Sequence, residues 1–273
     1  MTVCDCMLII LKICHPVRLL ERSEYILFCF STHQTWITMG LCWSANAQVL
    51  GKEKFPYKEA VPMSSQLWMK ITPAKVIVQI VYSEPDPSPD LLTYKKDLED
   101  LGVRVFLVPT GLGIQCVLKS QLIRLLAYQL PFIQDEDIIV TADVDAFVMH
   151  SDIYRPLTIP GKKIWLYRYA NTLDSGWTFM MPFIGLKKSV WKTLFNYDTS
   201  DDDLEKGVLG SNLPKMIGTY EKILRINRSS TWDLDQDIFT HEILRTGLCS
   251  LPQKHVLWDK LHISPKIQRY FLL

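Results

Sequence analysis

Apolar runs rich in β-branched residues alternate with longer amphipathic stretches through the first half of the chain. Continuous or alternating apolar runs are typical of strands, whereas apolar positions that recur every three to four residues are typical of helices. The runs predict strands at 36–42, 75–82, 103–108 and 137–149. The amphipathic stretches predict helices at 60–70, 90–101 and 119–128. Because this alternation builds right-handed crossovers, we expect an α/β fold with a mostly parallel, doubly wound, Rossmann-like sheet.

The second half of the chain has a less regular pattern. Strands are expected at 164–169 and 178–184, and helices at 189–195 and 233–245. Pro182 cannot donate a ladder hydrogen bond, so it places its strand at an edge or a bulge. These elements predict a smaller, mixed region after the parallel sheet.

Two stretches show little pattern. Residues 200–226 have no readable periodicity, and residues 1–34 look like a poorly defined N-terminal extension. Lys12, Arg18 and Glu21 interrupt the apolar residues of that extension. No run there approaches the roughly 20 apolar residues of a membrane span, and no clear signal peptide is evident. We therefore expect one domain over residues 35–273.

Two carboxylates, Asp143 and Asp145, stand one residue apart at the end of the apolar run that begins at Ile138. On a strand they would share one face, while Val144 would point to the other. The carboxyl ends of parallel strands are where open α/β sheets bind ligands. Because like charges so close are costly, the pair predicts a divalent cation held by oxygen ligands.

The composition of the chain adds little to the prediction of a cation site. The chain has 273 residues, of which 48% are hydrophobic and 22% charged, and its formal net charge is +1. A balance this close to neutral gives no indication of nucleic acid as a partner. The seven cysteines are scattered, and they indicate buried or free thiols with at most one disulfide.

Three strand–helix units followed by a strand with Asp143-Val144-Asp145 resemble a glycosyltransferase of the GT-A fold, closest to the glycogenin-like hexosyltransferases. The resemblance implies that Asp145 binds a divalent metal, manganese rather than magnesium, and that Asp143 contacts the metal or the ribose of the donor. It further implies a nucleotide-sugar donor, with a UDP-sugar favoured, and a glycan, protein or lipid acceptor. Family members work in the Golgi or secretory pathway behind a membrane anchor, which is not evident in residues 1–34.

Other segments match the family's pattern. Arg124, at the end of Ser120-Gln-Leu-Ile-Arg124, would lie near the donor phosphates, although it could equally be a surface cation. Gly176, in 175–181, would line the donor-sugar pocket, or it would simply begin a core strand. Asn46, after the first strand, would contact the base or ribose.

The late segment Trp232-Asp-Leu-Asp-Gln-Asp237 resembles the family's Asp-Gln-Asp element, which holds the transferred sugar. It makes Gln236 a donor contact, and Asp235 or Asp237 a catalytic base or sugar-orienting carboxylate. Acidic residues in a first helical turn can also simply cap the helix. Some relatives complete the metal shell with a late histidine, for which His255 and His262 are the candidates.

Three alternatives remain open. A glycosyltransferase-like domain without turnover would bind the donor only. A nucleotidyltransferase of similar fold would carry a Gly-rich, basic loop after the first strand, where none is evident. Asp143-Val-Asp-Ala-Phe147 also resembles metal motifs of lesion-bypass polymerases and haloacid-dehalogenase phosphatases, but those motifs lie on earlier strands.

Overall fold

The computed structural model describes residues 33–43, 57–83, 85–110, 115–151, 164–166, 169–172, 176–179, 181–196, 213–224 and 234–248. Residues 1–32 lie outside these ranges, so the N-terminal extension stays a prediction. Within these ranges, no helix combines the length and the apolar character that crossing a membrane requires.

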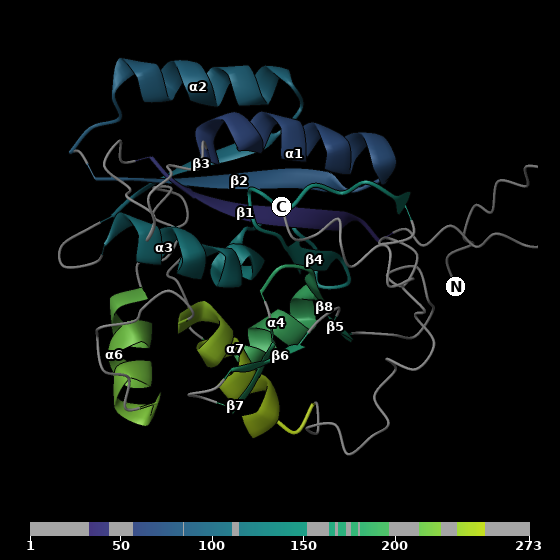
Figure 1. Ribbon diagram of the computed structural model, residues 1–273, viewed down its shortest axis with the longest axis vertical. Coiled ribbons are helices and arrows are strands. Elements are labelled where there is room, and N and C mark those ends of the chain that lie inside the picture. The colour runs from purple at the N-terminus through teal and green to yellow at the C-terminus, as the bar shows by residue number, and fades with distance from the viewer. Residues whose placement is uncertain are drawn as a thin grey trace, which may run out of the picture. The chain divides into compact units, whose positions relative to one another are not determined.

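A six-stranded mixed sheet organises the fold, with strand order β3-β2-β1-β4-β8-β5 (Figure 1). The strands β3, β2, β1 and β4 are parallel, whereas β8 runs antiparallel to both of its neighbours. The bounds are β1 Thr35–Cys42, β2 Lys75–Tyr82, β3 Arg104–Pro109, β4 Ile138–Thr141, β5 Ile164–Leu166 and β8 Ile184–Lys187. The expected α/β class and mostly parallel sheet are confirmed.

Helices cover both faces of this sheet (Figure 1). One face carries α1 Tyr57–Ile71 and α2 Pro89–Asp100. The other carries α3 Cys116–Ile123, the 3₁₀ helix η1 Arg124–Gln129, α4 Lys188–Leu194, α6 Leu213–Leu224 and α7 Leu234–Arg245. Each face has its own hydrophobic cluster, as a doubly wound sheet requires. A separate antiparallel pair, β6 Tyr169–Thr172 and β7 Gly176–Phe179, packs near α7.

Helix α1 continues through a proline because another side chain replaces the hydrogen bond that the proline removes. Pro62 has no N–H to donate to the carbonyl of Lys58, four residues earlier. The hydroxyl of Tyr94, on α2, donates to that carbonyl at 2.6 Å. The helix therefore keeps its first turn, which begins at Tyr57, beside the carboxyl end of β1.

Two predicted strands are wrong at one end. The strand expected at 137–149 stops at Thr141, so Asp143 and Asp145 lie beyond it. The strand expected at 164–169 ends at Leu166, and Tyr169 already belongs to β6.

The single strand expected at 178–184 is also wrong, because the chain turns between β7 and β8. Pro182 lies in this turn, and Phe183 adopts a positive φ of 69°. The N–H of Phe183 donates to the carbonyl of Thr141 at 2.7 Å, which starts the antiparallel pairing of β8 with β4.

Helix α1 begins three residues earlier than predicted, and two other helices differ more. The helix expected at 119–128 begins at Cys116 and tightens into a 3₁₀ helix from Arg124 onward. Helix α6 was not predicted at all. Its buried residues follow the spacing i, i+3, i+4 and i+7, at Leu213, Met216, Ile217 and Tyr220.

Candidate functional site

A cavity of about 150 Å³ opens at the carboxyl edge of the parallel strands. Its walls come from the end of β1, the start of α1, one side of α3, the turn after β4 and the start of α7. The described residues that line it are Gly40, Leu41, Cys42, Tyr57, Val117, Ser120, Gln121, Arg124, Asp143, Val144, Asp145, Asp235 and Gln236. This is the edge at which parallel α/β sheets bind ligands.

The two carboxylates of the Asp-x-Asp motif meet in the cavity through a turn and not through the pleat of a strand. The N–H of Ala146 donates to the carbonyl of Asp143 at 3.1 Å and closes this turn. Val144 is buried in the cluster on the α1 face, which leaves Asp143 partly exposed and Asp145 exposed. The expectation that both carboxylates share the cavity side holds, but its stated cause, strand alternation, is wrong.

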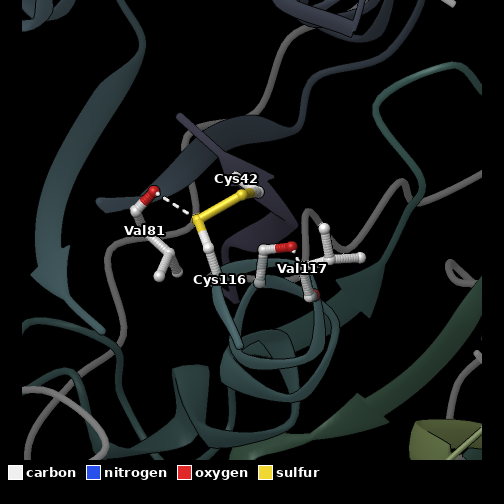
Figure 2. The surroundings of a disulfide bond; sticks show 5 residues. Cys42, Val81, Cys116 and Val117 are labelled. Carbon is white, nitrogen blue, oxygen red and sulfur yellow. Dashed lines mark hydrogen bonds between the residues drawn. A yellow bond between two sulfur atoms is a disulfide. The ribbon is translucent and has the colours of Figure 1, made fainter. Parts of the chain in front are cut away.

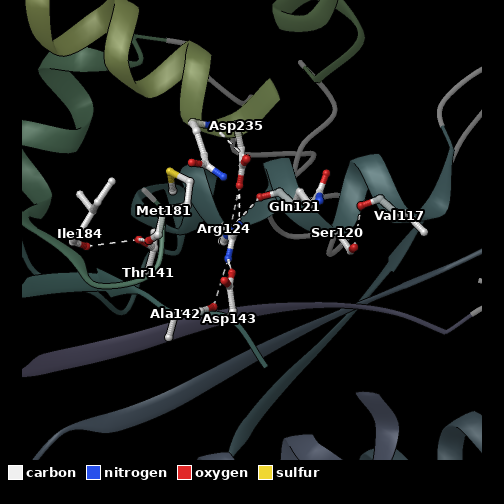
Figure 3. Close-up of polar contacts among 11 residues, drawn as sticks. Val117, Ser120, Gln121, Arg124, Thr141, Ala142, Asp143, Met181, Ile184 and Asp235 are labelled. Carbon is white, nitrogen blue, oxygen red and sulfur yellow. Dashed lines mark hydrogen bonds and ion pairs between the residues drawn. The ribbon is translucent and has the colours of Figure 1, made fainter. Parts of the chain in front are cut away.

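Arg124 lines the cavity and lies between the carboxylates of Asp143 and Asp235 (Figure 3). Its Nη1–H donates to Asp143 Oδ1, and its Nη2–H and Nε–H donate to Asp235 Oδ2 at 2.5 Å and 3.2 Å. The carbonyls of Gln121 and Ala142 accept further bonds from it at 3.1 Å and 3.3 Å. With only 8% of its side chain exposed, Arg124 is a fixed buried cation and not a surface one.

Asp235 supports Arg124 from the start of α7. Its side chain is 1% exposed, and its Oδ2 accepts both bonds from Arg124. Its Oδ1 accepts the N–H of Gln236 at 2.9 Å, as expected of an acidic residue in a first helical turn. Both oxygens are therefore engaged, and the side chain lies behind the guanidinium.

The buried charges shift one another's pKa. Burial raises the pKa of Asp235 to about 6, although Arg124 works in the opposite direction. Burial alone would lower the pKa of Arg124, but the charges of Asp143 and Asp235 more than offset this and raise it. Arg124 is thus charged throughout the physiological range, and Asp235 is mostly ionised at pH 7.

Besides burial, negative charge in the cavity also raises the pKa of two side chains near its exposed side, Asp145 and Tyr57. Partial loss of solvent and then the charge of Asp143 raise the pKa of Asp145, although its side chain is exposed. Burial, followed by the charges of Asp145 and Asp143, raises the pKa of the Tyr57 phenol. Tyr57 therefore stays protonated at neutral pH and remains a hydrogen-bond donor.

Asp143 and Asp145 fit a divalent cation in the chemistry of their donors. Both offer carboxylate oxygens, and a cation would offset the two effects that raise the pKa of Asp145, namely partial burial and then the charge of Asp143. Within the described ranges, no group of three His, Cys, Asp or Glu side chains converges as a metal site. His255 and His262 lie outside those ranges. Further ligands to such a cation would come from a bound ligand, from water or from residues outside the described ranges.

The remaining predicted site residues divide into three groups. Gln236 lines the cavity beside Asp235. Asp237 and Gly176 are not among the described residues that line it, and Gly176 begins β7 in the separate two-stranded sheet. Asn46 lies outside the described residues.

The sequence patterns missed two features of the cavity. Tyr57 carries no motif, and only its place at the start of α1 brings it near the carboxylates. A disulfide joins Cys42 to Cys116, which are 74 residues apart and stand in no recognisable cysteine motif.

A comparison with protein-family models and one with curated protein sequences find no match to this chain. Solved structures that it resembles include that of 4-diphosphocytidyl-2C-methyl-D-erythritol synthase, with a TM-score of 0.36 and 11% identity over 64% of this chain and 85% of the other. Another is the glycosyltransferase GlyE of Streptococcus pneumoniae TIGR4, with a TM-score of 0.31 and 8% identity over 82% and 67%. Likeness at this level says nothing about the activity of the chain.

Proposed function

We propose that the cavity binds a nucleotide-sugar together with a divalent cation, and that the chain transfers the sugar to an acceptor. The observation that carries this proposal is the arrangement of charge around Arg124. A fixed, buried guanidinium stands between Asp143 and Asp235, with Asp145 exposed beside it. Guanidinium groups suit the oxygens of phosphates in geometry as well as in charge.

The charge balance supports a requirement for the cation. Three carboxylates and one guanidinium line the described cavity, which leaves two negative charges when all are ionised. An anionic diphosphate would be repelled by this surplus. A divalent cation on Asp143 and Asp145 would cancel it, bridge to the diphosphate and stabilise the charge on the departing nucleoside diphosphate.

The side chains of the cavity have separate roles in this proposal. Arg124 binds a phosphate oxygen, and Asp235 keeps the guanidinium in place while the ligand enters. Gln236, at the start of α7, contacts the sugar with its amide. Tyr57 offers its hydroxyl proton as a donor to the ligand. A hexose, UDP as the nucleotide and manganese as the cation follow from the resemblance to the glycogenin-like group.

Replacement of Asp145 by alanine tests the binding half of the proposal. Because Asp145 is exposed, Asp145→Ala should fold like the parent but lose manganese-dependent stabilisation by UDP. For the parent, this stabilisation should reach about 2.7 kcal/mol when UDP is at a hundred times its Kd. The measurement is thermal unfolding with and without manganese and UDP.

Asp100→Ala is the matched control. Asp100 is also exposed, it pairs with Lys96 one turn earlier on α2, and it is not among the described residues that line the cavity. This variant should respond to UDP as the parent does. If Asp145→Ala binds UDP as tightly as Asp100→Ala, the proposed site is wrong.

Turnover separates an enzyme from a protein that only binds the donor. The parent should release UDP from a UDP-hexose when a suitable acceptor is supplied, and Asp145→Ala should not. Stabilisation by UDP and manganese without release of UDP from any tested UDP-hexose would instead indicate the binding protein.

A further inference from the structure

A disulfide joins the strand wall of the cavity to its helix wall. Cys42 is the last residue of β1 and Cys116 is the first of α3, with their Cα atoms 5.4 Å apart. Cys116 Sγ lies 3.2 Å from the carbonyl oxygen of Val81, at the end of β2 (Figure 2). The cross-link thus sits against the carboxyl ends of two neighbouring parallel strands.

The same two elements supply two of the walls of the cavity. Cys42 itself lines it, and α3 supplies Val117, Ser120 and Gln121 before Arg124 follows at the helix end. The eight residues of α3 span about 12 Å, so the cavity has two ends along this helix. The disulfide lies at one end of α3, and the ion pairs of Arg124 lie just past the other end.

The middle of α3 is held independently of the disulfide. A Cβ placed on Gly40 would lie 1.7 Å from the carbonyl oxygen of Ser120, so the helix touches the backbone of β1 there. Lys119 also donates to the carbonyl of Thr110 at 3.2 Å. Opening the disulfide would therefore leave α3 seated and release only its first turn, around Val117.

We propose that the Cys42–Cys116 disulfide controls how tightly this cavity binds a nucleoside diphosphate. This inference rests on the function proposed above. With the disulfide closed, the walls at Cys42 and Val117 are held at one spacing, and the nucleoside meets a preformed surface. With it open, binding must first order that end of the cavity, which lowers affinity.

The chemistry is thiol–disulfide exchange with a dithiol reductant. A thiolate of the reductant attacks one sulfur of the Cys42–Cys116 bond, which releases the other cysteine as a thiolate and forms a mixed disulfide. The second thiol of the reductant then attacks the reductant's sulfur in this mixed disulfide and releases the second cysteine. The protein gains two electrons and two protons as two thiols. The reductant loses the same number and becomes a disulfide.

Two probes distinguish the ends of the cavity. Inorganic pyrophosphate needs only the end with Arg124, Asp143 and Asp145, whereas UDP also extends along α3 toward Cys42. Opening the disulfide should weaken UDP binding about fivefold or more and change pyrophosphate binding by less than about twofold. Both affinities are measured with manganese by calorimetry, on the full chain before and after treatment with dithiothreitol.

A control variant isolates this disulfide from other thiols. It retains Cys42 and Cys116 and carries serine at Cys4, Cys6, Cys14, Cys29 and Cys249. Its UDP affinity should respond to dithiothreitol as the parent's does. The double variant Cys42→Ser, Cys116→Ser should bind UDP like the reduced parent, and dithiothreitol should not change its affinity for UDP. If the double variant does not fold, the reduced control variant provides the same comparison.

Mass spectrometry of alkylated protein shows whether the cross-link is open, and circular dichroism shows that the fold persists. Equal UDP affinity in the open and closed states would overturn the proposal and leave the disulfide a purely stabilising link. An equal loss of pyrophosphate affinity would overturn it as well, because the effect would then not be confined to one end. No binding of UDP or pyrophosphate in either state would overturn the proposed function itself.

Discussion

At the scale of single residues, Lys119 has an unusual environment for a lysine. Its side chain is buried on α3, and its Nζ donates to the carbonyls of Pro109 and Thr110 at the end of β3. Burial lowers the pKa of Lys119 to about 8. A neutral amine still carries two hydrogens, so both bonds survive deprotonation.

The depressed pKa predicts a pH dependence of stability. Between pH 8 and 9.5 the unfolded chain holds a proton on Lys119 that the folded chain has lost, so unfolding becomes less favourable as pH rises. The parent should gain about 1–2 kcal/mol relative to Lys119→Met across this window, after allowance for solvent screening. Urea unfolding of both proteins at several pH values measures it. A constant difference would mean that Lys119 titrates normally.

For Arg124, the sequence predicted the general location but not both of its ion-pair partners. The resemblance of Ser120–Arg124 to a glycosyltransferase segment implied a place near the phosphates, and the structure puts Arg124 in the same cavity as Asp143. Its second partner, Asp235, lies 111 residues later. Sequence spacing does not encode which distant carboxylate a buried guanidinium meets, because that depends on how α7 packs against α3. Asp235 was accordingly predicted as a possible base and not as the support of Arg124.

At the scale of elements, the packing of α3 on β1 depends on a missing side chain. Gly40 lies on the strand at the point where Ser120 of the helix passes. The clash involves backbone atoms on both sides, so no side-chain rotation relieves it. Helix and strand must separate if any Cβ is added.

Alanine at two glycines tests this contact. Gly40→Ala should lower the free energy of unfolding by about 3 kcal/mol or more, because the sheet and helix must shift. Gly218→Ala on α6 meets nothing within 4 Å and should raise it by about 0.5–1 kcal/mol through helix propensity. Chemical denaturation measures both variants. Equal effects would show that α3 does not approach β1 as closely as described.

The bounds of an element could be predicted from the sequence where hydrophobic burial alone determined them. The strand at 75–82 was predicted with its true bounds, because a continuous apolar run leaves a buried strand little freedom. Helix α6 was missed although Leu213, Met216, Ile217 and Tyr220 carry a helical spacing, since Pro214 and Gly218 interrupt it. The turn at Pro182 depends on the pairing of β8 with β4, which no local pattern indicates.

At the scale of the whole described fold, the two edges of the parallel sheet differ in composition. The carboxyl edge gathers the charged cavity around Arg124. At the amino edge, buried Asp137 accepts the N–H groups of Gln34 and Gln134 and the indole N–H of Trp36, at 2.9 to 3.1 Å. These bonds join the start of β1 to the start of β4. The edge that holds these strands together is therefore separate from the edge that carries the proposed binding site.

The alternation of strands and helices was sufficient to predict that candidate binding residues would gather at the carboxyl edge of the sheet. Parallel strands joined by right-handed crossovers place all their carboxyl ends at one edge, whatever the residues are. It could not predict that β8 and β5 extend the sheet beyond β4, because short strands with mixed direction leave only weak patterns. The position of the site was thus predictable from topology, and its detailed walls were not.

The separation of the two edges makes a final prediction. Asp137 and Asp143 lie beyond opposite ends of β4, whose four residues span about 13 Å. Asp137→Asn keeps the shape but leaves at least one of the three donors facing the amide nitrogen instead of an acceptor, so the free energy of unfolding should fall by about 2 kcal/mol. Its affinity for UDP and manganese, measured well below the unfolding temperature, should match the parent's. Asp145→Ala should show the reverse, with stability within about 0.5 kcal/mol of the parent and no binding. If Asp137→Asn weakened UDP binding in the folded protein, the two edges would be coupled through β4, and the cavity could not be treated as a site that the rest of the sheet merely supports.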